Sequence, residues 1–392
     1  MGKRVGIEVS LAISEAVKQA NVDAIAAYPI TPQTHIVEHL SELVAEGTLD
    51  AAFIPVESEH SAMSVCAGTA AAGARTYTAT SSQGLALMNE ILFIIPALRL
   101  PVVMTIANRS LSGPISIWND HSDIMSVRDT GWIAIFAENG QEAYDLTLQS
   151  FKIAEDHRVL LPISVNIDGF TLSHVIEPHE FLDQDEVDQF LPAYQPAVQL
   201  NPDAPVSMGM VGIPEIYTEA KKCQDEVLKA SMAVIKEVFA DFGKRFGRRY
   251  QVVESYRAEG AETLLLTMGS VSETAMETID RLRDQEQRPV GLLRLRLWRP
   301  FPVEDLIAAM PGVKTLAVVD RAVSSGGTGG PVAGEIRSAL YSVQDAPYVA
   351  SFIAGLGGRD ITIDDFAVMI TQAEAMAKVK EIHQYKMIGV RE

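Results

Sequence analysis

The sequence predicts a protein with two α/β units, each built on a mainly parallel β-sheet. Short apolar runs rich in β-branched residues alternate with segments of helical periodicity up to Asn166, and the same alternation resumes at Ala261. A proline-punctuated stretch separates the two regions. Strand–helix alternation of this kind is typical of a parallel sheet with helices on both faces. The length of 392 residues is enough for two or three domains.

The first unit is predicted to alternate regularly between strands and helices. Its predicted strands are Val22–Tyr28, Ala52–Val56, Thr76–Thr80, Pro101–Ala107, Trp132–Ala137 and Val159–Asn166. Its predicted helices are Glu8–Gln19, Thr34–Ala45, Glu59–Ala72, Leu85–Ile95 and Gln141–Ala154. Ligands bind at the carboxyl ends of the strands in such sheets, so we expect functional residues directly after strands.

The middle of the chain has a different character. Prolines punctuate an acidic stretch between residues 171 and 212, which we interpret as an extended arm, and a long helix, Glu215–Phe242, follows it. The second unit is predicted to have strands within Ala261–Ser270, Val290–Trp298, Thr315–Asp320 and Val349–Gly355, and helices at Val271–Asp284, Val303–Met310 and Gly330–Leu340. The predicted domains are residues 1–175, 176–250 and 251–392.

Charge and cysteine content exclude several classes of function. Lys and Arg total 32 and Asp and Glu total 51, which gives a formal net charge of −19. A surface this acidic repels phosphate backbones and anionic lipids, so we expect neither nucleic acid nor a membrane as a partner. Cys66 and Cys223 lie far apart and no CxxC motif occurs, so we expect a reducing cytoplasm and no iron–sulfur cluster on this chain. The N-terminal segment lacks the apolar core of a signal peptide.

Candidate site residues follow the first two strands. In YPITP, residues 28–32, two prolines fix the backbone around Thr31 and hold its hydroxyl group at the carboxyl end of the strand. The alternative is a rigid turn in which Thr31 is the N-cap of the next helix. In VESEHSA, residues 56–62, Glu59 begins a helix of small residues that can pack closely, which places its carboxyl group near a dry interface. The alternative is an acidic residue that only stabilises the N-terminus of its helix.

Further candidates follow the next two strands. In ATSSQGLALM, residues 79–88, Ser82 and Gln83 lie in a tight turn that can present N–H and hydroxyl groups to a ligand, although an ordinary strand-to-helix turn explains them equally well. In ANRSLSGPISIWNDHSD, residues 107–123, Arg109 directly follows an apolar strand and suits bidentate recognition of a carboxylate. The alternative is a structural ion pair between Arg109 and Asp120 or Asp123.

Other motifs are weaker. His35, Glu38 and His39 match the H-x-x-E-H zinc-protease signature, but no downstream acidic motif offers a third ligand, so we expect no metal ligand on this chain. The Gly-rich turns at residues 324–331 and 355–360 could cradle a phosphate or pack tightly against a partner subunit.

The motifs, taken in order, resemble those of one family. The chain is similar to the alpha subunits of pyruvate:ferredoxin oxidoreductases in YPITPQT, VESEHSA, TATSSQGLALM, ANRSLSGPISIWNDHSD, RDTGWI, NIDGF, RPFP and FIAGLGGRDI. This resemblance covers essentially the whole chain. It implies a pyrimidine-type thiamine-diphosphate-binding domain followed by a transketolase-C-terminal-like α/β domain. The implied reaction is that of pyruvate synthase, although enzymes for 2-oxoisovalerate and 2-oxoglutarate share much of the pattern.

The resemblance also implies roles for individual residues. Glu59, rather than Glu57, matches the catalytic glutamate that hydrogen-bonds the aminopyrimidine ring of thiamine pyrophosphate. Thr31 and Arg109 match residues that bind the substrate. The implied cofactor contacts are Glu59, Pro29, Ser82 and Gln83.

A division of labour between subunits is implied as well. The family binds the pyrophosphate and Mg²⁺ through a GDG motif, which does not occur here, so a beta subunit has to supply that half. Gamma and ferredoxin-like delta subunits, or fusions of them, would carry the iron–sulfur clusters, with coenzyme A and ferredoxin as co-substrates. The alternative of another class is a non-catalytic assembly subunit that keeps only the fold.

Overall fold

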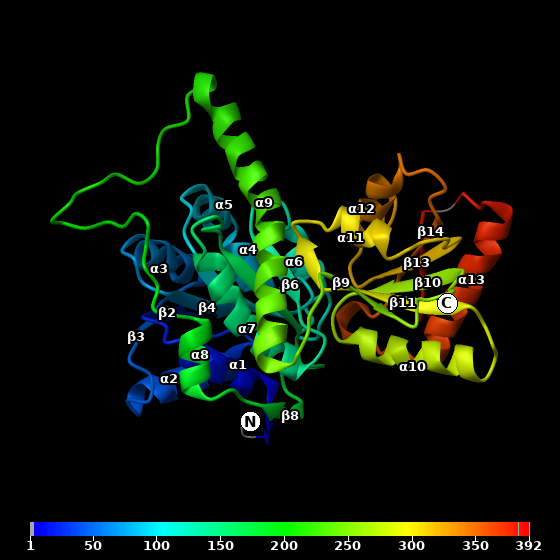
Figure 1. The fold of residues 1–392 in the computed structure, drawn as a ribbon, viewed down its shortest axis with the longest axis horizontal. Coiled ribbons are helices and arrows are strands. Elements are labelled where there is room, and N and C mark those ends of the chain that lie inside the picture. Colours follow the sequence, from blue (N-terminus) through cyan, green and yellow to red (C-terminus); the bar gives the residue numbers. More distant parts are fainter. Residues whose placement is uncertain (1–3, 383, 392) are drawn as a thin grey trace.

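Two sheets, one in each half of the chain, organise the structure (Figure 1). The computed structural model describes residues 4–382 and 384–391. Within these residues the first sheet has seven strands in the order β12-β6-β7-β5-β4-β2-β3. Its strands are β2 (Ala24–Ala27), β3 (Ala52–Pro55), β4 (Thr76–Thr80), β5 (Val102–Asn108), β6 (Ile133–Phe136), β7 (Ile163–Asp168) and β12 (Leu297–Arg299). All its neighbouring strands are parallel except β12 and β6, which are antiparallel.

Helices cover both faces of this sheet. They are α1 (Val9–Gln19), α2 (Thr34–Ala45), α3 (Glu59–Ala71), α4 (Ser82–Leu87), α5 (Asn89–Ala97), α6 (Ser122–Ser126) and α7 (Gly140–Glu155). The period-two alternation of β5 shows the two faces: Val103 and Ala107 pack in the core that includes α1, α2 and α7, whereas Met104 and Ile106 pack in the core that includes α3 and α5. Both faces are apolar because both are covered, as expected of a parallel sheet.

The second sheet has six strands in the order β15-β14-β13-β10-β11-β9 within the described residues. Its strands are β9 (Val253–Tyr256), β10 (Thr263–Thr267), β11 (Val290–Leu295), β13 (Thr315–Asp320), β14 (Tyr348–Ile353) and β15 (Lys386–Met387). Its helices are α10 (Val271–Asp284), α11 (Val303–Ala308), α12 (Pro331–Leu340) and α13 (Ile363–Val379), with a 3-10 turn, η1, at Leu356–Gly358. The prediction of two α/β units with mainly parallel sheets is therefore confirmed.

Four further elements lie outside the two large sheets and the helices that cover them. Strands β1 (Arg4–Glu8) and β8 (Ile176–Glu180) form a small antiparallel sheet, and α8 (Gln184–Phe190) follows it. Helix α9 (Pro214–Phe246) is longer than predicted and extends past the first unit, preceded by a stretch of chain that swings away from the body (Figure 1). The predicted arm is thus only partly extended. The predicted helix Leu85–Ile95 is wrong in detail, because α4 and α5 divide it at Met88.

The two units share secondary structure and core. We predicted one strand over Val290–Trp298, but the chain leaves the second sheet after β11 and enters the first sheet as β12. The crossing residue is Arg296, which is buried and donates to Glu142 and Glu254 at 2.5 and 2.7 Å. One hydrophobic core contains residues of both sheets, with the fully buried Trp298 among them. None of the described helices has the length and apolar character to cross a membrane.

A buried carboxylate also joins the units. Asp168, the last residue of β7, accepts hydrogen bonds from His121 Nε2, Arg321 Nη1 and the backbone N–H of Ser270, each at 2.9 Å. His121 belongs to the first unit, whereas Arg321 and Ser270 belong to the second. Burial opposes ionisation, but Arg321 and His121 outweigh it and hold the pKa of Asp168 well below its usual range. Ionised Asp168 therefore links the first unit to the second through hydrogen bonds to residues of both.

Replacing Asp168 by Asn should lower the free energy of unfolding by about 3–5 kcal/mol, because Arg321 is then buried without its counterion. Urea unfolding followed by circular dichroism would measure the change. The control is Asp225→Asn, which breaks an exposed pair with Lys229 and should cost less than about 1 kcal/mol.

The same carboxylate should give a pH dependence. Ionised Asp168 contributes fully to the free energy of unfolding above the pKa of an Asp in an unfolded chain, about 3.9. This contribution is lost as the pH falls toward the lower pKa that Asp168 has in the folded protein. The wild type should therefore lose more stability than Asp168→Asn below about pH 4. Equal unfolding free energies for the two proteins at neutral pH would contradict this account of the interface.

Candidate active site

The predicted site residues come together at one edge of the first sheet. Strands β5, β4, β2 and β3 are neighbours and run parallel, so their carboxyl ends meet at the same edge. The residues that follow these strands there are Pro29 and Thr31 after β2, Glu59 after β3, Ser82 and Gln83 after β4, and Arg109 after β5. Ligands bind at this edge in open α/β sheets.

Glu59 is buried at the start of α3. Its side chain is 6% exposed, and the N-cap of its helix is Ser58, whose hydroxyl accepts from the backbone N–H of Ser61 at 3.2 Å. Within the described part of the chain, the Glu59 carboxyl group has no hydrogen-bond or ion-pair partner. It therefore does not cap the helix, because Ser58 already does so. A buried carboxyl group without a partner is costly in a folded protein and is a candidate for binding a ligand.

The neighbouring Glu57 differs in both respects. Glu57 is exposed, and its carboxylate accepts a hydrogen bond from the Ser61 hydroxyl at 2.5 Å, which lowers its pKa. A tight approach of α4 confines Glu59 instead. A Cβ atom on Gly84 would lie 2.6 Å from Glu59 Oε1 and 2.5 Å from Thr80 Oγ1. Glycine at position 84 thus leaves the space that the Glu59 side chain occupies.

Asp123 fixes the turns after β4 and β5. This fully buried carboxylate accepts from the backbone N–H groups of Ser82 and Arg109 at 3.1 and 3.0 Å, and from Asn108 Nδ2 at 2.9 Å. Burial raises the pKa of Asp123 to about 6, although these donors act in the opposite direction. The hydroxyl group of Ser82 is also engaged, since Gln83 Oε1 and the Ser110 carbonyl both lie 2.6 Å from it and either can accept its single hydrogen. This turn is therefore held by several specific contacts.

The Arg109 guanidinium contacts backbone carbonyls rather than acids. Its Nε donates to the Ser116 carbonyl at 3.0 Å, and its Nη1 donates to the Thr31 carbonyl at 2.9 Å. Its Nη2 has no partner in residues 4–382 and 384–391. The alternative of an ion pair with Asp120 or Asp123 is wrong, because Asp123 meets only the Arg109 backbone. Burial lowers the pKa of Arg109, and the free donors are available to an anion.

Thr31 is exposed at the same edge. The N-cap of α2 is Gln33, so the alternative of Thr31 as the cap is wrong. Two other hydroxyl groups, Thr80 Oγ1 and Ser81 Oγ, are buried without a hydrogen-bond partner in the described structure. Thr80 was not singled out from the sequence, and of the two serines in the predicted turn only Ser82 was assigned to the site, although all three stand in the TATSSQG motif. Buried polar atoms without partners are rare in native proteins, so they add to the unmet hydrogen-bonding capacity of this edge.

The Gly-rich turns serve internal contacts. At α12, the N–H groups of Val332 and Ala333 already donate to Asp320 at 2.7 and 3.1 Å, so a phosphate has no free helix N-terminus there. In the second turn, a Cβ atom on Gly358 would lie 2.6 Å from the Cβ of Trp118. This turn packs against the first unit of the same chain.

The two histidines of the zinc-protease signature have different partners. His35 Nδ1 contacts Glu8 at 2.7 Å, whereas His39 contacts Glu15 and Glu42 at 3.3 and 3.4 Å. The two imidazoles therefore do not share one metal site, and a zinc-protease centre is not formed by this motif.

Comparisons with known proteins agree with one another. Residues 15–240 match the family model described as pyruvate flavodoxin/ferredoxin oxidoreductase, thiamine diphosphate-binding, and residues 261–366 match that of pyruvate:ferredoxin oxidoreductase core domain II. Pyruvate synthase subunit PorA of Methanocaldococcus jannaschii is 49% identical over 366 residues, which are 93% of either chain. Ketoisovalerate oxidoreductase subunit VorA of Pyrococcus abyssi is 42% identical, over 94% of this chain and 92% of its own.

A solved structure shares the fold. It is that of a 2-oxoglutarate:ferredoxin oxidoreductase from Magnetococcus marinus, with 2-oxoglutarate, coenzyme A and succinyl-CoA bound. The TM-score is 0.68 at 19% identity, and the match covers 96% of this chain and 66% of that chain. At this identity the likeness concerns the fold alone.

Replacing Gly84 by Ala should displace the Glu59 carboxyl group and lower the free energy of unfolding by about 1–3 kcal/mol, the usual cost of overpacking. Thermal unfolding and a crystal structure of the variant would show both effects. Gly68→Ala is the matched control, since Gly68 lies in α3 with open space around it and should gain up to about 1 kcal/mol. An unmoved Glu59 side chain in Gly84→Ala would contradict the steric argument.

Proposed function

Because this chain belongs to the pyruvate flavodoxin/ferredoxin oxidoreductase family, we propose that it is the pyruvate synthase subunit that holds the aminopyrimidine of thiamine pyrophosphate. The complex converts pyruvate and coenzyme A reversibly to acetyl-coenzyme A and CO2, and passes the electrons to ferredoxin. The similarity to PorA, which is 49% identical over 93% of both chains, supports pyruvate as the substrate. The structural observation that carries the proposal is the buried, unpartnered carboxyl group of Glu59 at the same sheet edge as Arg109.

The residues at this edge fit the aminopyrimidine. That ring system has nitrogen atoms and an amino group that need hydrogen-bond partners once they are buried. Glu59, Thr80 and Ser81 offer a carboxyl group and two hydroxyl groups that have no partner within the described chain. Pro29 is exposed after β2, which lies between β3 and β4, and would offer the ring an apolar surface, with the turn at Ser82 and Gln83 at the same edge.

The chain contributes positioning and proton control. Thiamine pyrophosphate, when bound, supplies the carbanion-stabilising chemistry that the decarboxylation of a 2-oxoacid requires. Glu59 holds its carboxyl group against a ring nitrogen of the aminopyrimidine and controls the proton at that atom.

Arg109 and Thr31 bind the substrate. The Nη2 group of Arg109 has no hydrogen-bond or ion-pair partner among the described residues, so it can donate to the carboxylate of the 2-oxoacid. The same guanidinium donates to the Thr31 carbonyl at 2.9 Å, so the Thr31 backbone lies next to the proposed anion-binding position. One cation thus binds the substrate and orients the second substrate contact.

Partner subunits complete the site. Exposed apolar side chains lie on α4 and in the segment after Arg109: Leu87 is 51% exposed, Ile115 77% and Trp118 51%. Apolar surface next to a binding edge is typical of a protein interface. A beta subunit that binds the pyrophosphate and Mg²⁺ covers this surface. Gamma and ferredoxin-like delta subunits carry the iron–sulfur clusters, and the complex acts in the cytoplasm.

A second candidate substrate is 2-oxoisovalerate. It is favoured by the 42% identity to the VorA subunit of a ketoisovalerate oxidoreductase. Assays of the purified native complex with pyruvate, 2-oxoisovalerate and 2-oxoglutarate, each with ferredoxin, would decide between them. The largest kcat/KM is expected for pyruvate.

Replacing Glu59 by Gln in the assembled complex should slow exchange of the thiamine C2 proton by about a hundredfold or more, because the proton at the ring nitrogen is no longer controlled. Deuterium exchange followed by quenching and NMR would measure the rate. Glu57→Gln is the matched control and should exchange normally. Normal exchange in Glu59→Gln would refute the catalytic role and favour a non-catalytic assembly subunit.

Replacing Arg109 by Ala should raise the KM for pyruvate about tenfold to a hundredfold with a smaller change in kcat, since a hydrogen bond to a charged group is worth about 1.5–3 kcal/mol. Steady-state kinetics with ferredoxin would measure both constants. Arg158→Ala, which removes an exposed arginine, is the control. An unchanged KM would exclude Arg109 from substrate binding.

A further inference from the structure

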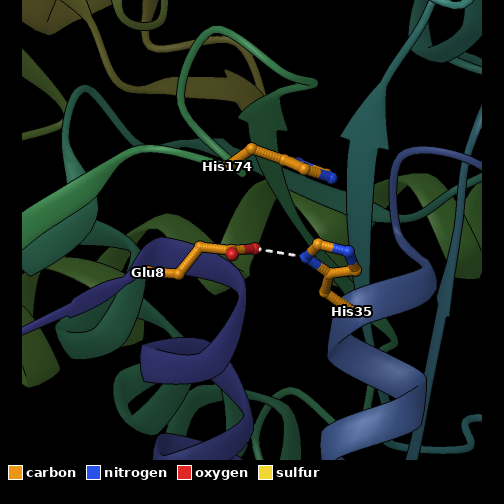
Figure 2. Close-up of side chains that lie close together, drawn as sticks. All are labelled: Glu8, His35 and His174. Atoms are coloured by element: carbon orange, nitrogen blue, oxygen red, sulfur yellow. Dashed lines mark hydrogen bonds and ion pairs between the residues drawn. The ribbon is translucent and has the colours of Figure 1, made fainter.

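Three side chains from separate elements converge on the first unit (Figure 2). Glu8 ends β1, His35 lies in the first turn of α2, and His174 lies between β7 and β8. One oxygen or nitrogen atom of each residue lies within 4.8 Å of those of the other two. Figure 2 shows Glu8 and His35 joined by a hydrogen bond, with the ring of His174 lying over the ring of His35.

We propose that Glu8, His35 and His174 bind a divalent transition-metal ion of the Zn²⁺ type. Two imidazoles and one carboxylate are a donor set found in zinc sites that keep a further coordination position open for water or a ligand. This site is distinct from the edge assigned to the cofactor and substrate, and it does not depend on the reaction proposed above.

The present spacing is close to that of a metal site. Bonds of about 2.0–2.2 Å in a tetrahedral site place neighbouring donor atoms about 3.3 Å apart. The Glu8 Oε1 to His35 Nδ1 distance is 2.7 Å, so this pair has to open by about half an ångström. His174 has to approach by about 1.5 Å at most, which side-chain rotation can supply without a change of fold.

The donor atoms are available. His35 Nδ1 contacts only Glu8, which would share the ion with it, and His174 Nε2 has no hydrogen-bond partner among the described residues. Glu8 is the N-cap of α1 but makes no side-chain cap hydrogen bond, so its carboxylate is turned toward His35 instead. The Ser173 hydroxyl contacts His174 Nδ1 at 2.8 Å and orients the ring, as partners of metal-bound histidines do.

A stack of rings links this cluster to the candidate active site. The ring centroids of Trp118 and Phe170 are 4.9 Å apart, those of Phe170 and His174 are 4.7 Å apart, and those of His174 and His35 are 4.4 Å apart. Trp118 lies in the segment whose Ser116 carbonyl holds Arg109. An ion that linked His174 to His35 of α2 would therefore reduce the mobility of Phe170 and, through it, of the segment that contains Trp118.

The test uses the full chain, stripped with a chelator, desalted and titrated with ZnCl2 in a calorimeter. We expect one ion per chain, and affinities at least about tenfold weaker for His35→Gln and for His174→Gln, since each removes one of three ligands. His39→Gln is the matched control, because His39 lies one turn further along α2 and pairs with Glu15 and Glu42. It should bind as the wild type does.

Two further measurements keep the outcome clear. Zn²⁺ should raise the unfolding temperature of the wild type and of His39→Gln but not of Glu8→Gln, a variant that keeps an oxygen facing His35. Co²⁺ should give a visible spectrum without a thiolate charge-transfer band. The proposal is overturned if the wild type binds no ion at micromolar Zn²⁺, if His35→Gln and His174→Gln bind as tightly as the wild type, or if a thiolate band places the ion at the exposed Cys223.

Discussion

The buried carboxylate of Asp168 is the contact on which the arrangement of the molecule depends. An ionised group in the interior is tolerated only if its partners stay in place. Its partners are His121 in the segment after β5 and Arg321 in the second unit. Arg321 also donates to Asn119 at 2.9 Å. The second unit therefore holds the C-terminal end of the segment that carries the Ser116 contact of Arg109, although it contributes no proposed catalytic residue.

The first sheet contains two buried carboxyl groups at its functional edge, and their surroundings differ. Asp123 accepts hydrogen bonds from backbone N–H groups and from Asn108, so its hydrogen-bonding capacity is used by the chain itself and it needs no ligand. Glu59 is 6% exposed, against 0% for Asp123, and has no partner in the described residues. Folding tolerates such an unmet group most readily where binding later satisfies it. The contrast separates a structural acid from a candidate functional acid more clearly than sequence position does.

Local patterns predicted much of this architecture. Alternating apolar runs located the main parallel strands, and parallel order alone places Thr31, Glu59 and Arg109 at one edge. The crossing at Arg296 was not predictable, because the run Val290–Trp298 is continuously apolar around two arginines and its break depends on partners distant in sequence. The β1–β8 pair and the Glu8, His35 and His174 cluster join residues from opposite ends of the first unit. Such contacts exist only in three dimensions and leave no periodic signal.

Strand β12 belongs to the second half of the chain but pairs with β6 of the first sheet, so the two halves cannot be expressed separately without loss. A truncated protein ending at the predicted boundary, residue 250, would keep most of the first sheet but lack the strand that pairs with β6. Its open edge would present unpaired N–H and C=O groups, a common starting point for aggregation. Trp298 would be missing from the core as well. The two halves are therefore interlocked, and the second completes the first before any partner subunit arrives.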